Sequence, residues 1–243
     1  MSEDQGSPRN DSEFDAYAHA YDEALMRGVS VSGEDKDYFA HGRVQWTLRR
    51  LAEIQFVPRK ILDFGCGTGS AFAYFLADSR VESLHGIDLS AASLAIAARN
   101  HSDARLKLQT VPEFTTQNSL DLAFCNGVFH HIPLAERKAA ADVVFRALKP
   151  GGIFTLWENN PWNPGTRIVM SRIPFDRDAI PVSAPRARAL LRETGFEIVR
   201  TDFMFIFPRM LKWMRGLEPV LSGLPLGAQY MVVGRKPKTG GED

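Results

Sequence analysis

The hydrophobic pattern of the chain changes character at Pro58. Upstream of that residue, apolar positions recur at helical spacing in two segments, 12–26 and 35–54. We expect these segments to form an N-terminal helical annex, residues 13–57. Downstream, the spacing becomes that of alternating strands and helices, so residues 58–235 are expected to form the main domain.

Short apolar runs alternate with amphipathic segments throughout that main domain. Such alternation predicts right-handed crossovers and a mostly parallel sheet, with ligands bound at the carboxyl ends of the strands. The strands are expected at 60–64, 83–87, 106–109, 120–125, 153–157, 196–203 and 228–234, and the helices at 71–76, 91–100, 134–148 and 185–193.

An insertion, residues 204–225, separates the last two expected strands. Within 208–224, apolar residues recur at helical spacing, and Arg209, Lys212 and Arg215 stand between them. This pattern predicts an amphipathic helix or a pair of short ones. Its apolar side either packs on the sheet, which is the commoner arrangement, or lies on a membrane surface as an interfacial helix.

The composition is that of an ordinary globular protein. Hydrophobic residues make up 44% and charged residues 24% of the 243 positions, which excludes disordered, collagen-like and coiled-coil classes. The 29 basic residues balance the 29 acidic ones, so no net field attracts a phosphate backbone. We therefore expect no nucleic-acid partner, and composition leaves the oligomeric state open.

The ends and the cysteines add little chemistry. Residues 1–12 and 236–243 are polar and are expected to be mobile tails. No secretory signal is present, and no uncharged apolar run reaches the ~18 residues of a transmembrane helix, so a cytoplasmic location is expected. Cys66 and Cys125 lack the spacing of a zinc site or a disulfide framework, so we expect reduced thiols and no metal.

The strongest local motif is a glycine-rich turn, ILDFGCGTGS at 61–70. Glycines between a strand and a helix allow a tight turn and a close approach of ligand to backbone. A dinucleotide fingerprint would place its third glycine at Ser70, and no Gly-Lys-Ser or Gly-Lys-Thr of a phosphate loop follows. A ligand other than a cradled phosphate is therefore favoured.

This turn and the segments that follow it resemble the class I S-adenosylmethionine-dependent methyltransferase family. The resemblance spans roughly residues 58–200 and implies a Rossmann-like, doubly wound α/β sheet of seven strands whose last strand is antiparallel. The matching segments are DFGCGTG at 63–69, GIDLS at 86–90, LDLAFCN at 120–126, VFHHI at 128–132 and LKPGG at 148–152. FDAYAHAYD at 14–22, GEDKDYF at 33–39, NPWNP at 160–164 and PLGAQY at 225–230 further resemble a bacterial type 11/12 group, which implies no particular acceptor.

The resemblance implies S-adenosylmethionine as cofactor, with S-adenosylhomocysteine as product. Asp88, with Leu89 beside it, is then expected to accept hydrogen bonds from the ribose hydroxyls; the alternative is a turn or helix N-terminal charge. Gly65 and Gly67 are expected to lie against the methionine part, which Asn126 helps to hold.

Further cofactor contacts are expected on both sides of that turn. Asp63 stands in an apolar strand and needs a donor, either loop amides or the cofactor's ammonium group. Val111 is expected near the adenine, and Arg43 near the cofactor's carboxylate unless it lies on a solvated helix face. The annex is expected to act as a lid that excludes water, with Tyr21 facing the cofactor and Tyr17 the substrate.

Two histidines, His130 and His131, follow the fourth expected strand. Methyl transfer is an in-line displacement, so a base is needed only when the nucleophile must lose a proton. A histidine can take that proton near neutral pH; alternatively, the pair caps the loop or packs on the cofactor. Asn159 and Trp162, after the fifth strand, are expected to orient the acceptor.

The sequence thus predicts a methyltransferase acting on a small molecule, with O-methylation favoured and a glycan or lipid-linked intermediate as candidate acceptor. Peripheral membrane contact is compatible with the insertion. Two alternative functions are also compatible with a strand, a glycine-rich turn and a later acidic residue such as Asp88. One is a nicotinamide-dependent oxidoreductase, and the other is a non-catalytic cofactor-binding module on the same fold. Ser70 and Asp63 weigh against the oxidoreductase.

Overall fold

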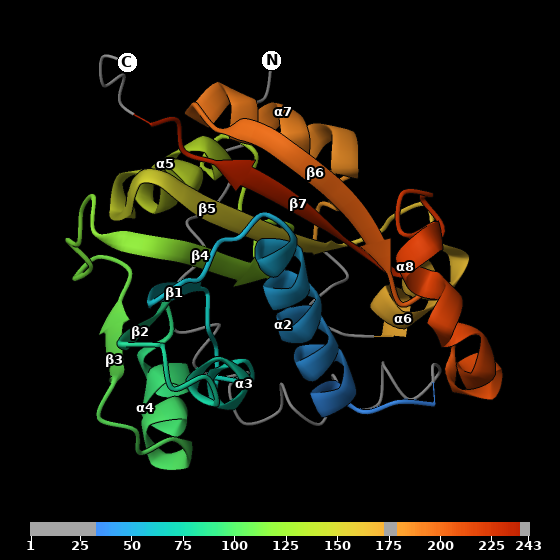
Figure 1. The fold of residues 1–243 in the computed structure, drawn as a ribbon, viewed down its shortest axis with the longest axis horizontal. Helices are drawn as coiled ribbons and strands as arrows, with labels where there is room; N and C mark the ends of the chain where they lie inside the picture. Colours follow the sequence, from blue (N-terminus) through green and yellow to red (C-terminus); the bar gives the residue numbers. More distant parts are fainter. Residues whose placement is uncertain (1–32, 173–178, 239–243) are drawn as a thin grey trace, which may run out of the picture.

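One seven-stranded sheet organises the molecule in the computed structural model, which describes residues 33–172 and 179–238 (Figure 1). The strand order is β3-β2-β1-β4-β5-β7-β6, and β7 runs antiparallel to both of its neighbours. The expected fold class is therefore confirmed. The strands are β1 (Lys60–Phe64), β2 (Ser83–Asp88), β3 (Leu106–Thr110), β4 (Leu120–Asn126), β5 (Leu148–Asn159), β6 (Glu197–Met204) and β7 (Gln229–Arg235).

Helices cover both faces of this sheet (Figure 1). They are α2 (Lys36–Glu53), α3 (Phe72–Leu76), α4 (Ala91–Asn100), α5 (Arg137–Ala147), α6 (Pro164–Arg172), α7 (Ala184–Thr194) and α8 (Glu218–Leu221), with a 3-10 helix, η3 (Arg209–Leu217). The first expected helix, 12–26, lies outside the described residues. Among those described, no helix is long and apolar enough to cross a bilayer.

Successive residues of the central strands pack into two separate hydrophobic cores, one on each face of the sheet. On β1, Leu62 packs in the core under α5 and α7, whereas Ile61 packs in the core under α2, α3 and α4. Because both faces are covered, β4 is buried along almost its whole length, and its residues 122–125 form a continuous apolar run. Cys66 and Cys125 are buried and form no disulfide, as expected.

Element boundaries differ most from expectation at the start of α5 and of β5. The expected helix at 134–148 begins at Arg137, and β5 begins at Leu148, because Leu148 already pairs with Leu120 before a bulge. Helix α6 was not predicted at all. Its signal was present, since Asn163 Oδ1 accepts the Thr166 N–H at 3.0 Å and a proline follows the cap.

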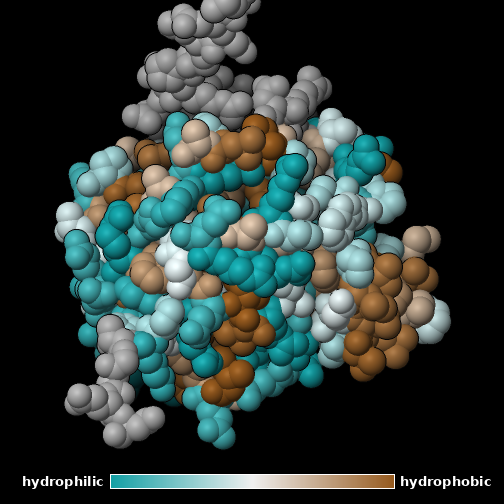
Figure 2. Space-filling model, turned by 90° about the horizontal axis from the view of Figure 1, so that it is seen from above, coloured by the Kyte–Doolittle hydropathy of each residue, from teal (hydrophilic) through white to brown (hydrophobic). Residues whose placement is uncertain are grey.

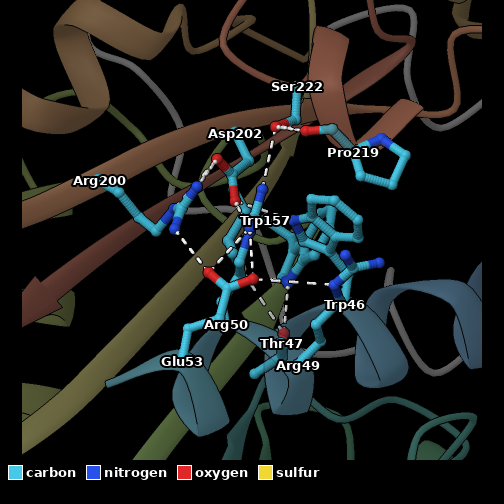
Figure 3. Close-up of polar contacts among 11 residues, drawn as sticks. Trp46, Thr47, Arg49, Arg50, Glu53, Trp157, Arg200, Asp202, Pro219 and Ser222 are labelled. Atoms are coloured by element: carbon cyan, nitrogen blue, oxygen red, sulfur yellow. Dashed lines mark hydrogen bonds and ion pairs between the residues drawn. The ribbon is translucent and has the colours of Figure 1, made fainter. Parts of the chain in front are cut away.

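Helix α2 is fixed to the sheet by buried polar contacts, here called the Asp202 cluster (Figure 3). Asp202, on β6, accepts hydrogen bonds from Trp46 Nε1 at 2.9 Å and Arg50 Nε at 2.8 Å. Beside it, Trp157 Nε1 on β5 donates to Thr47 Oγ1 at 3.0 Å. The described part of the annex is thus fixed to β5 and β6 by buried hydrogen bonds.

The first part of the insertion does not pack its apolar side on the sheet. It forms η3, with non-helical backbone at Leu211, followed directly by α8. Within Arg209–Leu217 no residue is buried, and Met210 and Trp213 are 83% and 77% exposed. The expectation that this apolar side packs on the sheet is therefore wrong for η3.

Candidate active site

A cleft opens where β1 and β4 end, with α2 as its other wall. It holds about 270 Å³ of space, including the part open to solvent. Its walls include Arg43, Asp63, Gly65 and Asn126, four residues that the sequence assigned to a cofactor. The carboxyl-end position is where a parallel sheet is expected to bind its ligand.

The glycine turn gives this cleft its floor. Gly65 and Gly67 have φ of 71° and 53°, in the left-handed region that side chains disfavour. A Cβ on Gly65 would lie 2.3 Å from Cγ2 of Val128, so a side chain there would displace the loop after β4. At Gly67 a Cβ would meet nothing within 4 Å, which leaves that stretch of backbone open to a ligand.

Asp88 connects the turn to the end of β2. Its carboxylate accepts the N–H of Gly67 at 2.8 Å and the N–H of Ser90 at 2.9 Å. Val111 lies next to it, because the Val111 N–H donates to the Asp88 carbonyl at 3.0 Å, and Leu89 is exposed beside it. Asp88 therefore has a structural role in the turn, whatever contact it also makes with a ligand.

Asp63 and Arg43 both line the cleft, one with a carboxyl group and the other with a guanidinium group. Burial first, and then the charge of Asp88, raise the pKa of Asp63 from 3.8 to about 8, and the Arg43 guanidinium only partly offsets them. Arg43 is buried and donates from Nη1 to Gln229 Oε1 at 3.1 Å, so the solvated-face alternative is wrong. Gln229, which sequence analysis missed, donates in turn to Asn159 Oδ1 at 3.1 Å.

A buried histidine and glutamate pair lies at the ends of β4 and β5. His130 Nδ1 is 2.7 Å from Glu158 Oε2, and the His130 N–H donates to Oε1 at 3.3 Å. Burial alone would raise the pKa of Glu158, but the charge and hydrogen bond of His130, with the charge of His131, hold it below its ordinary value. Glu158 was not assigned from the sequence, since nothing local pairs it with a histidine.

The remaining predicted residues fall into different places. The ring of His131 lies 4.0 Å from that of His130 and is half-buried. Trp162 is largely exposed in the loop after β5 and is not a wall of the cleft. Tyr17 and Tyr21 lie outside the described residues.

Comparison with known proteins identifies this architecture. A family model described as a methyltransferase domain matches residues 62–154, from β1 to β5. The trans-aconitate 2-methyltransferase of Methylobacterium nodulans is 27% identical over 221 residues, which cover 81% of this chain and 83% of that protein. These matches together indicate a class I S-adenosylmethionine-dependent methyltransferase. This methyltransferase is thus an enzyme of the predicted class, and the oxidoreductase alternative falls.

Two further matches place the methyltransferase among its relatives. The ubiquinone biosynthesis O-methyltransferase of Psychrobacter arcticus is 32% identical over 122 residues, 47% of this chain and 46% of that protein. The crystal structure of an S-adenosylmethionine-dependent methyltransferase from Mesorhizobium loti superposes with a TM-score of 0.56 at 18% identity, over 79% of this chain and 98% of the other. That structure shares the fold.

The cleft of the methyltransferase fits the cofactor that its class implies. The side-chain oxygen of Asn126 is buried and makes no hydrogen bond with any described residue, so it is a ready acceptor for an ammonium group. Asp63 on the same wall has a carboxyl group that can pair with such a group once it gives up its proton. The open backbone at Gly67 admits a ligand without displacing a side chain.

Proposed function

We propose that this methyltransferase transfers a methyl group to the oxygen of a small molecule that carries a hydroxyl group. The observation that carries the proposal is the buried contact of 2.7 Å between His130 Nδ1 and Glu158 Oε2. A carboxylate at that distance favours the tautomer with the proton on Nδ1, in which Nε2 is the acceptor nitrogen. The pair is thereby prepared to receive the proton of a hydroxyl nucleophile.

Different residues of the cleft and of the glycine turn bind different parts of the cofactor. Asp63 and Asn126 take the cofactor's ammonium group, Arg43 its carboxylate, and Gly65 and Gly67 lie along the methionine part. Asp88 takes the ribose, with Leu89 and Val111 beside the adenine. Bound S-adenosylmethionine supplies an electrophilic methyl group on a sulfonium.

His130 acts as the general base. With a cofactor held by Asp63, Asn126 and Arg43 supplying the methyl group, His130 Nε2 would take the proton that the acceptor's hydroxyl group loses. Glu158 balances the resulting charge on the ring, and its lowered pKa keeps it ionised for that purpose. Positioning of the two reactants by the cleft contributes the larger part of the rate.

A carboxylic acid acceptor is the second candidate, because a relative that covers 81% of this chain is named as a trans-aconitate 2-methyltransferase. A carboxylate is already a nucleophile and has no proton to lose. In that case His130 contributes a hydrogen bond rather than a base.

One assay separates the two candidates. The intact chain is supplied with methyl-labelled S-adenosylmethionine and with trans-aconitate, small phenols and lipid-linked phenols in turn, and His130→Gln is compared with the parent. With a hydroxyl acceptor, we expect His130→Gln to lower turnover by about 100-fold. Labelling of trans-aconitate alone, at a rate that His130→Gln leaves unchanged, would replace the hydroxyl acceptor by the carboxylate. Labelling of nitrogen alone would overturn O-methylation.

A further inference from the structure

A protruding apolar surface is formed by η3, α8 and the segment that follows them, here called the 210–226 surface. Figure 2 shows hydrophobic residues gathered on a lobe at the right of the view, the side on which Figure 1 places η3 and α8. Val220 is 84% exposed, as fully as Met210 and Trp213. The exposed apolar residues of this surface are Met210, Leu211, Trp213, Leu217, Val220, Leu224 and Leu226.

The charges on this surface have one sign. Arg209 and Lys212 are exposed, and Arg215 is half-buried against Glu34. Within the described residues 209–228 the one carboxylate is Glu218, which is buried. Its Oε1 accepts the N–H groups of Ile206 and Phe207 at 3.0 and 3.1 Å, so it does not face outward. Among residues 209–228, apolar side chains are thus combined with positive charge and no exposed carboxylate, and Glu34, paired with Arg215, is an acidic neighbour.

We propose that the 210–226 surface docks the protein on an anionic phospholipid membrane. Exposed apolar side chains with lysine and arginine among them are the makeup of an interfacial segment. Each basic residue near an anionic leaflet adds to the attraction. A tryptophan such as Trp213 suits the headgroup boundary, because its ring is apolar and its N–H is polar.

The shape of the surface favours lipid over a second copy of the chain or another protein. Met210, Trp213 and Val220 stand out from the body rather than lining a hollow. A protein partner would need a cavity of matching shape, whereas the lipid interface accepts a convex apolar feature of any outline. The positive charge also opposes contact of this surface with its own copy.

Docking would bring a defined side of the molecule to the bilayer. Asn160, which follows β5, donates to the carbonyls of Pro225 and Gly227 at 3.1 and 2.8 Å. Asn163 donates to the carbonyl of Leu226 at 2.8 Å. The 210–226 surface is therefore held against the loop that leaves the carboxyl end of β5, the same end of the sheet as the cleft.

The test uses the intact chain and does not depend on the acceptor or on activity. Co-sedimentation is measured with vesicles of phosphatidylcholine alone and of phosphatidylcholine with about one quarter phosphatidylserine. We expect binding to the anionic vesicles, weakened about tenfold in Trp213→Ser and in Val220→Ser. Val57→Ser is the matched control, because Val57 is 48% exposed before β1, outside the 210–226 surface.

The charge is tested separately. Lys212→Gln is expected to weaken binding to anionic vesicles about fivefold, and the exposed Lys107 on β3, changed to Gln, is expected to leave it unchanged. Failure of the intact chain to bind either vesicle would overturn the proposal. So would binding that Trp213→Ser and Val57→Ser alter equally. A dimer in solution that Trp213→Ser dissociates, without lipid binding, would assign the surface to a second copy instead.

Discussion

His130 Nδ1 and Glu158 Oε2 are 2.7 Å apart although the two residues are 28 positions apart in the chain. The parallel pairing of β4 with β5 creates this contact, since it brings the ends of both strands to one edge. Both side chains are buried, so the hydrogen bond is shielded from water. Glu158 is thereby placed to fix the orientation and the tautomer of the ring.

Replacing Glu158 with Gln should reduce kcat for a hydroxyl acceptor by about 10- to 100-fold and leave KM nearly unchanged. The amide can keep a hydrogen bond to the ring but cannot balance a positive charge on it. Steady-state kinetics across pH 6 to 9 check this, with the exposed Glu136→Gln as control. Equal losses in kcat and in folded fraction would indicate a purely structural role.

Removing the carboxylate of Asp88 should weaken the binding of S-adenosylhomocysteine. Asp88→Ala loses a charged hydrogen-bond acceptor worth ~1.5 to 3 kcal/mol, which corresponds to roughly 10- to 150-fold in Kd. Calorimetry measures the change directly. Because Asp88 also holds Gly67 and Ser90, Ser90→Ala serves as a control that removes the α4 cap and keeps the carboxylate. Unchanged affinity in Asp88→Ala would remove it from the site.

The raised pKa of Asp63 predicts that cofactor affinity depends on pH. Below pH about 8 the carboxyl group of the unliganded protein is mostly protonated, so a bound ammonium group must displace that proton. Affinity for S-adenosylhomocysteine should therefore rise between pH 6 and 8, by up to about tenfold per unit. Asp63→Asn should bind more weakly at pH 8 and lose this slope. A slope that persists in Asp63→Asn would contradict the assignment.

The same pKa makes a prediction about stability. Its folded value, about 8, lies above the ordinary 3.8, so between these values the folded protein holds a proton that the unfolded chain releases. Stability is thus lost as pH rises through this window. Asp63→Asn, which cannot ionise, should raise Tm relative to the parent most strongly above pH 8 and least near pH 4. Thermal unfolding at several pH values, without cofactor, decides the sign.

The Asp202 cluster should dominate the stability of α2. Asp202→Ala leaves the buried Arg50 without its carboxylate, which is expected to cost about 3 to 5 kcal/mol of unfolding free energy. Asp142→Ala removes an exposed ion pair with Lys138 and should cost less than about 1 kcal/mol. Denaturant unfolding of both variants tests the difference; equal costs would show that the cluster adds nothing beyond a surface pair.

Local patterns were sufficient to predict most of the fold. Strands buried on both faces read as continuous apolar runs, and the glycines of the turn adopt backbone angles that few other residues tolerate. Helix α6 could have been added from Asn163 and the proline after it. The exposure of η3 could not have been predicted, because helical spacing of apolar residues does not show whether another part of the protein covers them.

The sequence named four wall residues of the cleft, Arg43 among them, but not the tertiary contacts that hold them in place. Asp63, Gly65 and Gly67 are close in sequence, and Asn126 follows a recognisable strand. The contact of Arg43 with Gln229 joins residues 186 positions apart, and it depends on how α2 crosses β7. Such pairs are set by tertiary packing, so a single sequence carries no periodicity or motif for them.

The Asp202 cluster also bears on the order in which the chain assembles. Helix α2 supplies one wall of the cleft, yet its buried anchor stands on β6, which is made after most of the domain. A nascent chain that has completed the glycine turn and β5 has the floor of the cleft but no partner for Trp46 and Arg50. Thr47 can already meet Trp157 of β5, but Trp46 and Arg50 gain their carboxylate only when β6 has emerged and paired with β7, so complete anchoring of α2 requires a nearly finished polypeptide.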